Sequence, residues 1–183
     1  VINQGDGPLA KTIDEDTIVT WTARDLHATD TDTSASSLAW NLLTSTSNGT
    51  ATVYGNGSSP SPLSYQPNAN YHGSDSFSVQ VSDGENNDSI TINLTINPID
   101  DSTSVSGDTN ASIAEDGFAF GDLNATDVDG LTDDSYFSIS IAPANGSASI
   151  DPTDGTWTYA PNPNFVGSDP FVVSITDDLN PPT

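Results

Sequence analysis

NYHGSDSFSVQVSDG, residues 70–84, is the stretch that decides the fold. Its apolar residues Phe77, Val79 and Val81 alternate with serine and glutamine. An alternation of period two is typical of a β-strand that buries one face and exposes the other. Glycines flank the alternating run, as turns at both ends of a strand require. The stretch therefore predicts a half-buried β-strand over residues 75–81.

The same pattern occurs a second time in the chain. Residues 64–84, SYQPNANYHGSDSFSVQVSDG, align without a gap with residues 158–178, TYAPNPNFVGSDPFVVSITDD. Shorter matches precede them in the same order: IDEDT with IAEDG, ATDTD with ATDVD, and SNGTATV with ANGSASI. Several independent matches in one order indicate an internal duplication. We expect two homologous domains, residues 1–100 and 101–183.

Each copy is expected to be all-β. In the first copy, apolar residues alternate or cluster over strand lengths at 17–23, 37–43, 50–55, 75–81 and 89–96. Gly, Asn, Pro and Asp separate these runs at short intervals, and no segment has a helical pattern. About seven strands in about 95 residues fit a Greek-key β-sandwich. The predicted fold is two tandem sandwiches of this kind.

The second sandwich is expected to lack its last strand. After Asp83 the first copy continues with another apolar run, SITINLTI, whereas Asp177 and Asp178 are followed only by LNPPT. The opening residues VINQGDGP resemble TINPIDDS at 95–102, which ends the first copy. The chain thus resembles a segment of a longer array, and the second domain is expected either to be weakened or to have its open edge filled by a neighbour.

Composition excludes several classes of partner and site. The chain has 26 acidic residues, two basic residues and a net charge of −24, which repels nucleic acids and anionic membranes. Cysteine is absent, so there are no disulfides and no thiolate metal sites. With 33% hydrophobic residues, so large a charge also permits disorder, which we expect only of a calcium-free state.

The acidic residues gather at turns that are equivalent in the two copies. Asp127-Val-Asp129 in the second copy matches Asp30-Thr-Asp32 in the first, and others flank predicted strands. Crowded carboxylates repel each other unless a cation intervenes. Calcium binds six to eight hard oxygen ligands in flexible geometry, whereas magnesium prefers strict octahedra and water. The pattern therefore favours calcium over the simpler role of acidic residues as solubilising or turn-capping groups.

These motifs together identify a resemblance. Glu-Asp near the first strand, Asp-x-Asp, Asn-Gly, the segment from Tyr65 to Phe77 and the late Asp83-Gly84 resemble bacterial cadherin-like tandem repeats. Such repeats occur in large surface adhesins and in some secreted polysaccharide-degrading proteins. They are similar to animal cadherin domains, which bind calcium at the junction between consecutive sandwiches. The resemblance implies a secreted or cell-surface location and calcium as the cofactor.

Carried over to this sequence, the resemblance implies two groups of metal ligands. The junction between the domains would use Glu15, Asp75, Asp100, Asp101, Asp127, Asp129 and Asp177. The outer pole of the first domain would use Asp6, Asp30, Asp32 and Asp83. Glu115 and Asp169 would face a further repeat.

The leading hypothesis is a calcium-rigidified structural module that extends or presents adhesive domains, with calcium and neighbouring repeats as its partners. The alternative is a module that itself binds polysaccharide or another copy in a calcium-dependent way. An enzyme is not expected, because a catalytic pair of carboxylates is not usually duplicated with the fold. Trp21, Trp40 and Trp157 are expected to lie in the sandwich cores rather than to form a sugar-stacking platform.

Overall fold

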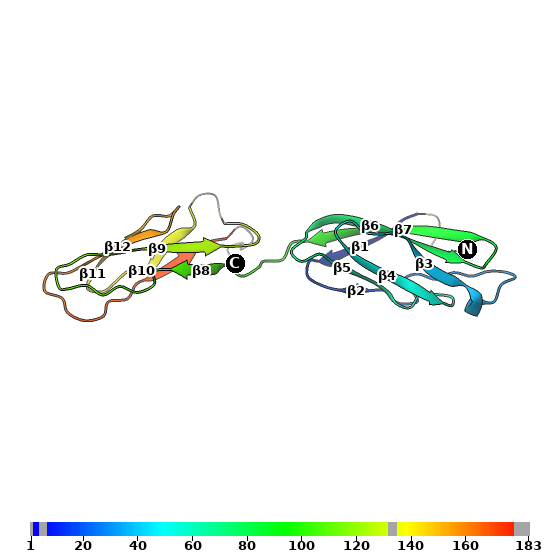
Figure 1. Cartoon of the computed structure of the whole chain (residues 1–183), viewed down its shortest axis with the longest axis horizontal. Coiled ribbons are helices and arrows are strands. Elements are labelled where there is room, and N and C mark those ends of the chain that lie inside the picture. The colour runs from blue at the N-terminus through cyan, green and yellow to red at the C-terminus, as the bar shows by residue number, and fades with distance from the viewer. Residues whose placement is uncertain (1, 4–6, 132–134, 178–183) are drawn as a thin grey trace. The chain divides into compact units, whose positions relative to one another are not determined.

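The computed structural model describes residues 2–3, 7–131 and 135–177 (Figure 1). It divides into two compact units, Val1–Ile99 and Asp100–Thr183, here called unit 1 and unit 2. The predicted ligand Asp6 lies outside the described residues. No helix within the described ranges is long and apolar enough to cross a membrane.

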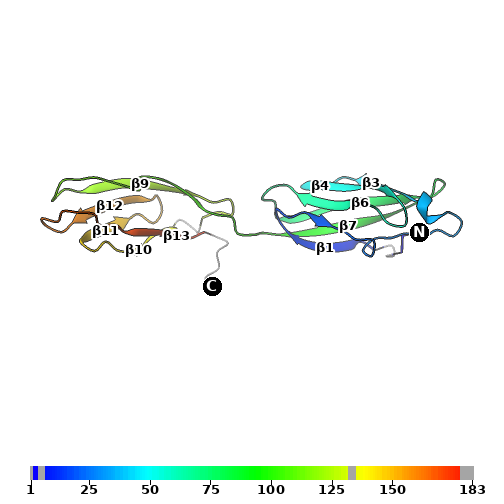
Figure 2. The same cartoon turned by 90° about the horizontal axis from the view of Figure 1, so that it is seen from below.

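Unit 1 is built from seven β-strands and one short 3₁₀ turn, Ala35–Ser37. The strands are β1 (Leu9–Asp14), β2 (Val19–Thr20), β3 (Ala39–Thr44), β4 (Gly49–Asn56), β5 (Leu63–Pro67), β6 (Gly73–Ser82) and β7 (Asn87–Asn97). Their order in the hydrogen-bonded sheet is β1-β7-β6-β3-β4-β5-β2. Figure 2 shows β1, β7 and β6 side by side. The strand predicted at 75–81 is the centre of β6.

The sheet of unit 1 folds into two layers because β4 belongs to both. Its first part, Gly49–Val53, pairs with β5, and its end pairs with β3. The chain turns at Gly55, where φ is 112° and an added Cβ would lie 2.8 Å from the carbonyl oxygen of Ser61. The alternating residues of β6 and β7 point between the layers, so that Phe77 and Ile92 are at most 1% exposed.

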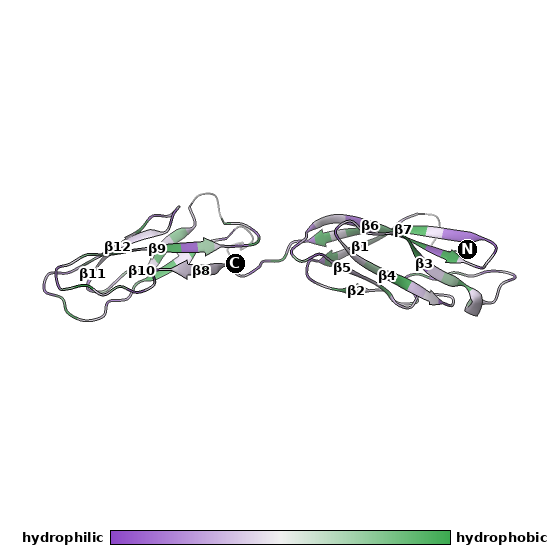
Figure 3. Cartoon of the chain, in the orientation of Figure 1, coloured by the Kyte–Doolittle hydropathy of each residue, from purple (hydrophilic) through white to green (hydrophobic). Residues whose placement is uncertain are grey.

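The described part of unit 2 has six strands in two separate sheets. They are β8 (Ser104–Gly107), β9 (Ala119–Thr126), β10 (Phe137–Ile141), β11 (Gly146–Ile150), β12 (Thr156–Pro161) and β13 (Val172–Ile175). One sheet has the order β11-β12-β9-β8, and the other contains only β10 and β13. Figure 3 shows hydrophobic residues within the strands of both units and polar colours along most of the connecting loops.

The two units are copies of one fold that differ at the positions of β7 and β1. β10, β13, β11 and β12 correspond by sequence to β3, β6, β4 and β5. In unit 1, β6 also pairs with β7, and β7 pairs in parallel with β1. In the described part of unit 2, no strand follows β13, and the segment that corresponds to β1 is not a strand. The prediction of two tandem all-β sandwiches is confirmed, and the described residues of unit 2 contain no counterpart of β7.

In each unit, one indole ring contacts the equivalent phenylalanine, but the tryptophan that supplies it comes from a different strand. In unit 1, Trp21 donates its amide to the carbonyl of Leu63, and its ring meets Phe77 edge-on at 6.0 Å. In unit 2 the equivalent cross-strand pair is Gly121 and Trp157. The Trp157 ring meets Phe171 edge-on at 5.7 Å, and a Cβ at Gly121 would lie 2.6 Å from that indole. The tryptophan therefore lies on a different strand in each unit. In unit 2, the absence of a side chain at Gly121 leaves room for the Trp157 ring.

Candidate metal centre

Five aspartates gather at one end of unit 2. They are Asp100, Asp101, Asp127, Asp129 and Asp177, here called the aspartate cluster. Antiparallel pairing of β8 with β9 sets Ser104 opposite Thr126 and so brings the residues before β8 next to the loop after β9. An isolated bridge between Leu131 and Asp177 adds the end of β13. Three segments far apart in sequence therefore converge on one site.

Hydrogen bonds tie the three segments together. The Asp101 amide donates to Asp129 Oδ2 at 2.7 Å, and the Asp129 amide donates to Asp127 Oδ1 at 2.9 Å. The Thr103 hydroxyl lies 2.8 Å from Asp127 Oδ2 and 3.4 Å from Asp177 Oδ2. Asp177 is 9% exposed. The Asp-x-Asp turn thus holds the chain segment that enters unit 2.

Negative charge accumulates at this cluster. Desolvation raises the pKa of Asp100, and the charges of Asp177, Asp127, Asp129 and Asp101 raise it further, in that order. Residues 100–183 contain 15 acidic residues and no Lys, Arg or His. No side chain of unit 2 can therefore neutralise the aspartate cluster, and only protons or dissolved cations can do so.

The oxygen-rich ligand set suits a hard cation such as calcium. Within the described ranges, however, no three His, Cys, Asp or Glu side chains are arranged closely enough to hold a metal ion as they stand. Mutual repulsion keeps carboxylates apart when no cation lies between them. An ion would have to draw the oxygens of the aspartate cluster together.

Glu15 lies at the opposite end of its own unit, where the chain leaves unit 1. It is 2% exposed and follows β1, where Asp14 pairs with Asn97 of β7. Its Oε1 accepts the amide of Ile99 at 2.8 Å. Its Oε2 is buried and has no hydrogen-bond partner among the described residues. A buried carboxylate oxygen without a partner is costly, and a bound cation would satisfy it.

Asp75, the other predicted ligand of unit 1, has a structural role. Its carboxylate accepts hydrogen bonds from the amides of Ser47 (3.1 Å), Asn48 (2.9 Å) and Ser76 (2.8 Å) and from the Tyr65 hydroxyl (2.9 Å). Burial raises the pKa of Asp75, but these hydrogen bonds outweigh it and lower the pKa overall. Because its oxygens are already engaged, we leave Asp75 out of the ligand set proposed below.

Asp169 repeats this arrangement in unit 2. It accepts hydrogen bonds from the amides of Ala144 and Asn145 and from the Tyr159 hydroxyl, all at 2.8 Å. Glu115, the other residue predicted to face a further repeat, is exposed. The Asp–Tyr contact is therefore a recurring feature of the fold.

The predicted outer group of unit 1 is partly assembled. Hydrogen bonds from the Asp32 side chain and from the amides of Thr33 and Asp32 lower the pKa of Asp30 to about 2. The hydrogen bond and charge of Asp30 raise the pKa of Asp32. Amides of Asn86 and Glu85 donate to Asp83 and lower its pKa. The side chains of Asp30 and Asp32 thus interact with each other, whereas Asp83 closes its own turn.

Two kinds of residue at these sites were not recognised from the sequence. Asp16 and Asp116, beside the glutamates, adopt φ values of 56° and 61° and accept the amides of Asn70 and Asn164. Each of them fixes a loop of its unit through this hydrogen bond. The recurrence of the Glu-Asp motif in both copies is the sequence signal that could have indicated this role. Thr103, which links two aspartates, carries no such signal.

The tryptophans lie in or against the cores, as expected. Trp40 and Trp157 are 1% and 5% exposed, and Trp21 is half-buried against the core of unit 1. Exposed aromatic rings occur elsewhere: Phe118 and Phe120 are 75% and 78% exposed. Phe120 lies in β9, and Phe118 precedes the first residue of that strand.

Comparison with known families gives two matches along this chain. The family model described as "Bacterial Ig domain" matches residues 2–97 and again residues 96–180. This family consists of non-catalytic modules. A search of curated proteins gives no match.

Solved structures resemble the chain at low identity. The extracellular cadherin domains 1–5 of protocadherin gamma B2 are 12% identical with a TM-score of 0.48, and the match covers 94% of this chain and 38% of that one. An endo-fucoidan hydrolase of glycoside hydrolase family 107 is 14% identical (TM-score 0.37; coverage 96% and 26%). The S-layer protein rSbsC is 17% identical (TM-score 0.31; coverage 79% and 19%). The chain spans well under half of each.

Proposed function

Since the chain belongs to the bacterial Ig domain family, in two tandem copies, we propose that it is an extracellular structural module stiffened by calcium. Calcium would bind at the aspartate cluster and order the segment that connects the repeats. The module would extend or present adhesive domains in a longer array.

The observation that carries this proposal is the convergence of the five aspartates in a unit without a basic side chain. Such a cluster is stabilised when a divalent cation replaces the mutual repulsion with attraction. Carboxylates, the Thr103 hydroxyl and nearby backbone carbonyls are the oxygen ligands that calcium prefers.

Glu15 supports an effect on the connection between the repeats. Its Oε1 holds the amide of Ile99, the residue that precedes Asp100 in the chain. A cation at the buried Oε2 of Glu15 would order the end of this connection that belongs to unit 1, and calcium at the aspartate cluster would order the end that belongs to unit 2. Without calcium the connection would be flexible. With calcium, the orientation of consecutive repeats would be fixed.

Calcium titration of the whole chain tests the proposal. A ligand that binds only the folded state adds about 3 kcal/mol of stability at a free concentration about 100 times its Kd. For a unit of this size, that raises the melting temperature by roughly 10–20 °C. We expect this rise in millimolar calcium, reversal by a chelator, and a heat of binding in calorimetry.

Small-angle scattering should show a narrower range of inter-domain distances with calcium than with chelator. Magnesium at the same concentration is the control for general charge screening. A melting temperature that does not change between calcium and chelator would refute the proposal.

A polysaccharide-binding role is the second candidate, favoured by the exposed rings of Phe118 and Phe120. Aromatic faces pack against sugar rings, and two exposed phenylalanines so close in sequence would offer apolar rings for such a contact. We expect retardation of the chain in native gels that contain an uncharged polysaccharide. The double variant Phe118→Ala/Phe120→Ala should lose this retardation. Retardation that the double variant keeps would reject this surface.

A further inference from the structure

The outer face of the sheet of unit 2 carries a row of three side chains, one from each of β11, β12 and β9. The register pairs Ser149 with Thr158 and Thr158 with Phe120. Directly paired residues of antiparallel strands point to the same face of a sheet. All three side chains are exposed, and Phe120 is 78% exposed. Ser149, Thr158 and Phe120 are here called the outer row.

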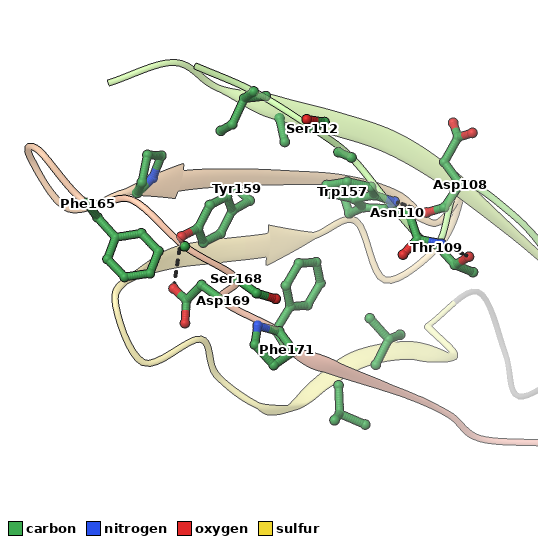
Figure 4. Close-up of a pocket in the computed structure, with 18 of the residues that line it drawn as sticks. Asp108, Thr109, Asn110, Ser112, Trp157, Tyr159, Phe165, Ser168, Asp169 and Phe171 are labelled. Atoms are coloured by element: carbon green, nitrogen blue, oxygen red, sulfur yellow. Dashed lines mark hydrogen bonds between the residues drawn. The ribbon is translucent and has the colours of Figure 1, made fainter. Parts of the chain in front are cut away.

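The neighbours of Thr158 along β12 define the opposite, inner face. Trp157 and Tyr159 flank Thr158 in the strand. Their rings both contact Phe171, with centroids 5.7 Å and 6.5 Å from its own. Figure 4 shows these rings on the side of β12 that faces Phe171. Because side chains alternate along a strand, the outer row points away from the core.

The outer row combines two kinds of contact that suit a sugar. The hydroxyl oxygens of Ser149 and Thr158 lie 2.8 Å apart in a hydrogen bond. Each hydroxyl can donate one hydrogen bond and accept two, so the pair keeps capacity for the hydroxyls of a ligand. The exposed Phe120 ring beside them offers an apolar face for stacking. Because neighbouring strands are about 4.8 Å apart, the row is about 10 Å long and suits a short stretch of polysaccharide laid across the strands.

The outer row carries no charge, although unit 2 has 15 acidic side chains and no basic one. On the same face, Asp122 stands in the next row, opposite Thr156. Such a unit repels an anionic polymer, and it repels a second copy of this chain with its net charge of −24. A cationic partner would be attracted to the carboxylates rather than to an uncharged row. An uncharged polymer rich in hydroxyl groups is therefore the partner that the chemistry of the row favours.

Unit 1 keeps the two hydroxyls of this row but not the ring. Its equivalent residues are Thr52, Ser64 and Thr20, which pair in the same register. Serine and threonine are interchanged between the copies, so the hydroxyl pair is present in both. Thr20 stands in the place of Phe120, and Thr52 and Ser64 are half-buried. Of the two rows, that of unit 2 alone combines an aromatic ring with exposed hydroxyls.

We propose that the outer row binds an uncharged polysaccharide that lies across β9, β12 and β11. One sugar ring stacks on Phe120, and sugar hydroxyls form hydrogen bonds with Thr158 and Ser149. The inference rests on the second candidate function above and adds to it the class of ligand and the two hydroxyl side chains. Neither kind of contact involves the aspartate cluster.

Affinity electrophoresis of the whole chain in native gels tests the proposal. The uncharged probes are hydroxyethyl cellulose, a galactomannan and dextran, and carboxymethyl cellulose is the anionic counterpart of the first. We expect retardation by at least one uncharged probe and none by carboxymethyl cellulose. Thr158→Val/Ser149→Ala should weaken the binding at least about fivefold, because hydrogen bonds to the ligand are lost. The matched control Thr95→Val/Ser89→Ala makes the same changes on the exposed side of β7 and should bind as the parent does.

Transfer of the ring to unit 1 is a second test. In the background of Phe118→Ala/Phe120→Ala, the change Thr20→Phe places a ring beside the hydroxyls of Ser64 and Thr52. Thr20 is exposed in its strand, and phenylalanine has a favourable β-propensity. We expect this triple variant to recover part of the retardation. Asn93→Phe in the same background, which exposes a ring on β7, should recover none.

Four results would overturn the proposal. They are the absence of retardation by all three uncharged probes, equal retardation by carboxymethyl cellulose, unchanged binding of Thr158→Val/Ser149→Ala, and equal behaviour of the two ring transfers. Unchanged binding of that variant, together with loss of retardation in Phe118→Ala/Phe120→Ala, would leave the second candidate function in place with the rings as its site. The response of the melting temperature to calcium decides the calcium proposal independently of all these results.

Discussion

Asp127→Asn combined with Asp129→Asn is expected to abolish the calcium-induced stabilisation of unit 2. Asp127 accepts the amide of Asp129 in the Asp-x-Asp turn, and the charges of both carboxylates contribute to the raised pKa of Asp100. Asparagine keeps the shape and one acceptor oxygen, so the hydrogen bonds from the amides of Asp101 and Asp129 remain feasible. Removal of two of five charges should weaken calcium binding by about 100-fold or more, or about 3 kcal/mol.

The same double variant should be more stable than the parent chain in chelator, because two repelling charges are gone. These opposite effects separate a metal site from a merely structural turn, whose loss would destabilise the unit in both conditions. Melting curves in calcium and in chelator measure both effects. Asp122→Asn with Glu115→Gln is the matched control, since it removes the same charge from exposed positions outside the cluster. Equal calcium responses of the two double variants would contradict the assignment.

Asp75→Asn is expected to destabilise unit 1 by about 2–3 kcal/mol. Three backbone amides and the Tyr65 hydroxyl donate to the Asp75 carboxylate. In asparagine, an NH₂ group replaces one carboxylate oxygen and would face donors that then have no acceptor. A buried donor left without an acceptor costs about 1–3 kcal/mol. Urea unfolding followed by hydrogen exchange, which resolves the two units, measures the loss. Asp169→Asn is the comparison variant, and its cost should be smaller because Asp169 is only half-buried and water can reach its donors.

The Asp75 carboxylate also predicts an acid limit for unit 1. Its pKa is lowered in the folded state, so its contribution is fully present above the unfolded value of about 4 and is lost as the pH falls through the folded value. Stability of the parent unit 1 in chelator should therefore decline between about pH 5 and pH 2, and Asp75→Asn should flatten that decline. A decline of the same size in both proteins would show that other groups cause it.

The architecture could be predicted from the sequence because its signals are local. Alternation in residues 75–81 marks β6, and the gapless match with 158–178 transfers that prediction to unit 2. The resemblance to cadherin-like repeats grouped Asp127 and Asp129 with the linker residues Asp100 and Asp101, and in the structure the Asp101 amide donates to Asp129.

Other features could not be predicted because they depend on cross-strand register. A buried aspartate that accepts amides and one that binds a metal have the same sequence signal, so Asp75 was grouped with the ligands. Trp21 and Trp157 occupy non-equivalent positions in the sequence. Only the pairing of their strands reveals that both rings contact the equivalent phenylalanines, Phe77 and Phe171.

The exchange of tryptophan and glycine between the copies also affects how the chain folds. Neighbouring homologous domains can misfold by swapping equivalent strands. If the strand of Trp21 paired with that of Trp157, two indoles would compete for one space, and Gly121 opposite Leu63 would leave a void in the other unit. Both overpacking and cavities are destabilising. The two copies share a fold, but their cores are mutually incompatible, and each unit recognises its own strands.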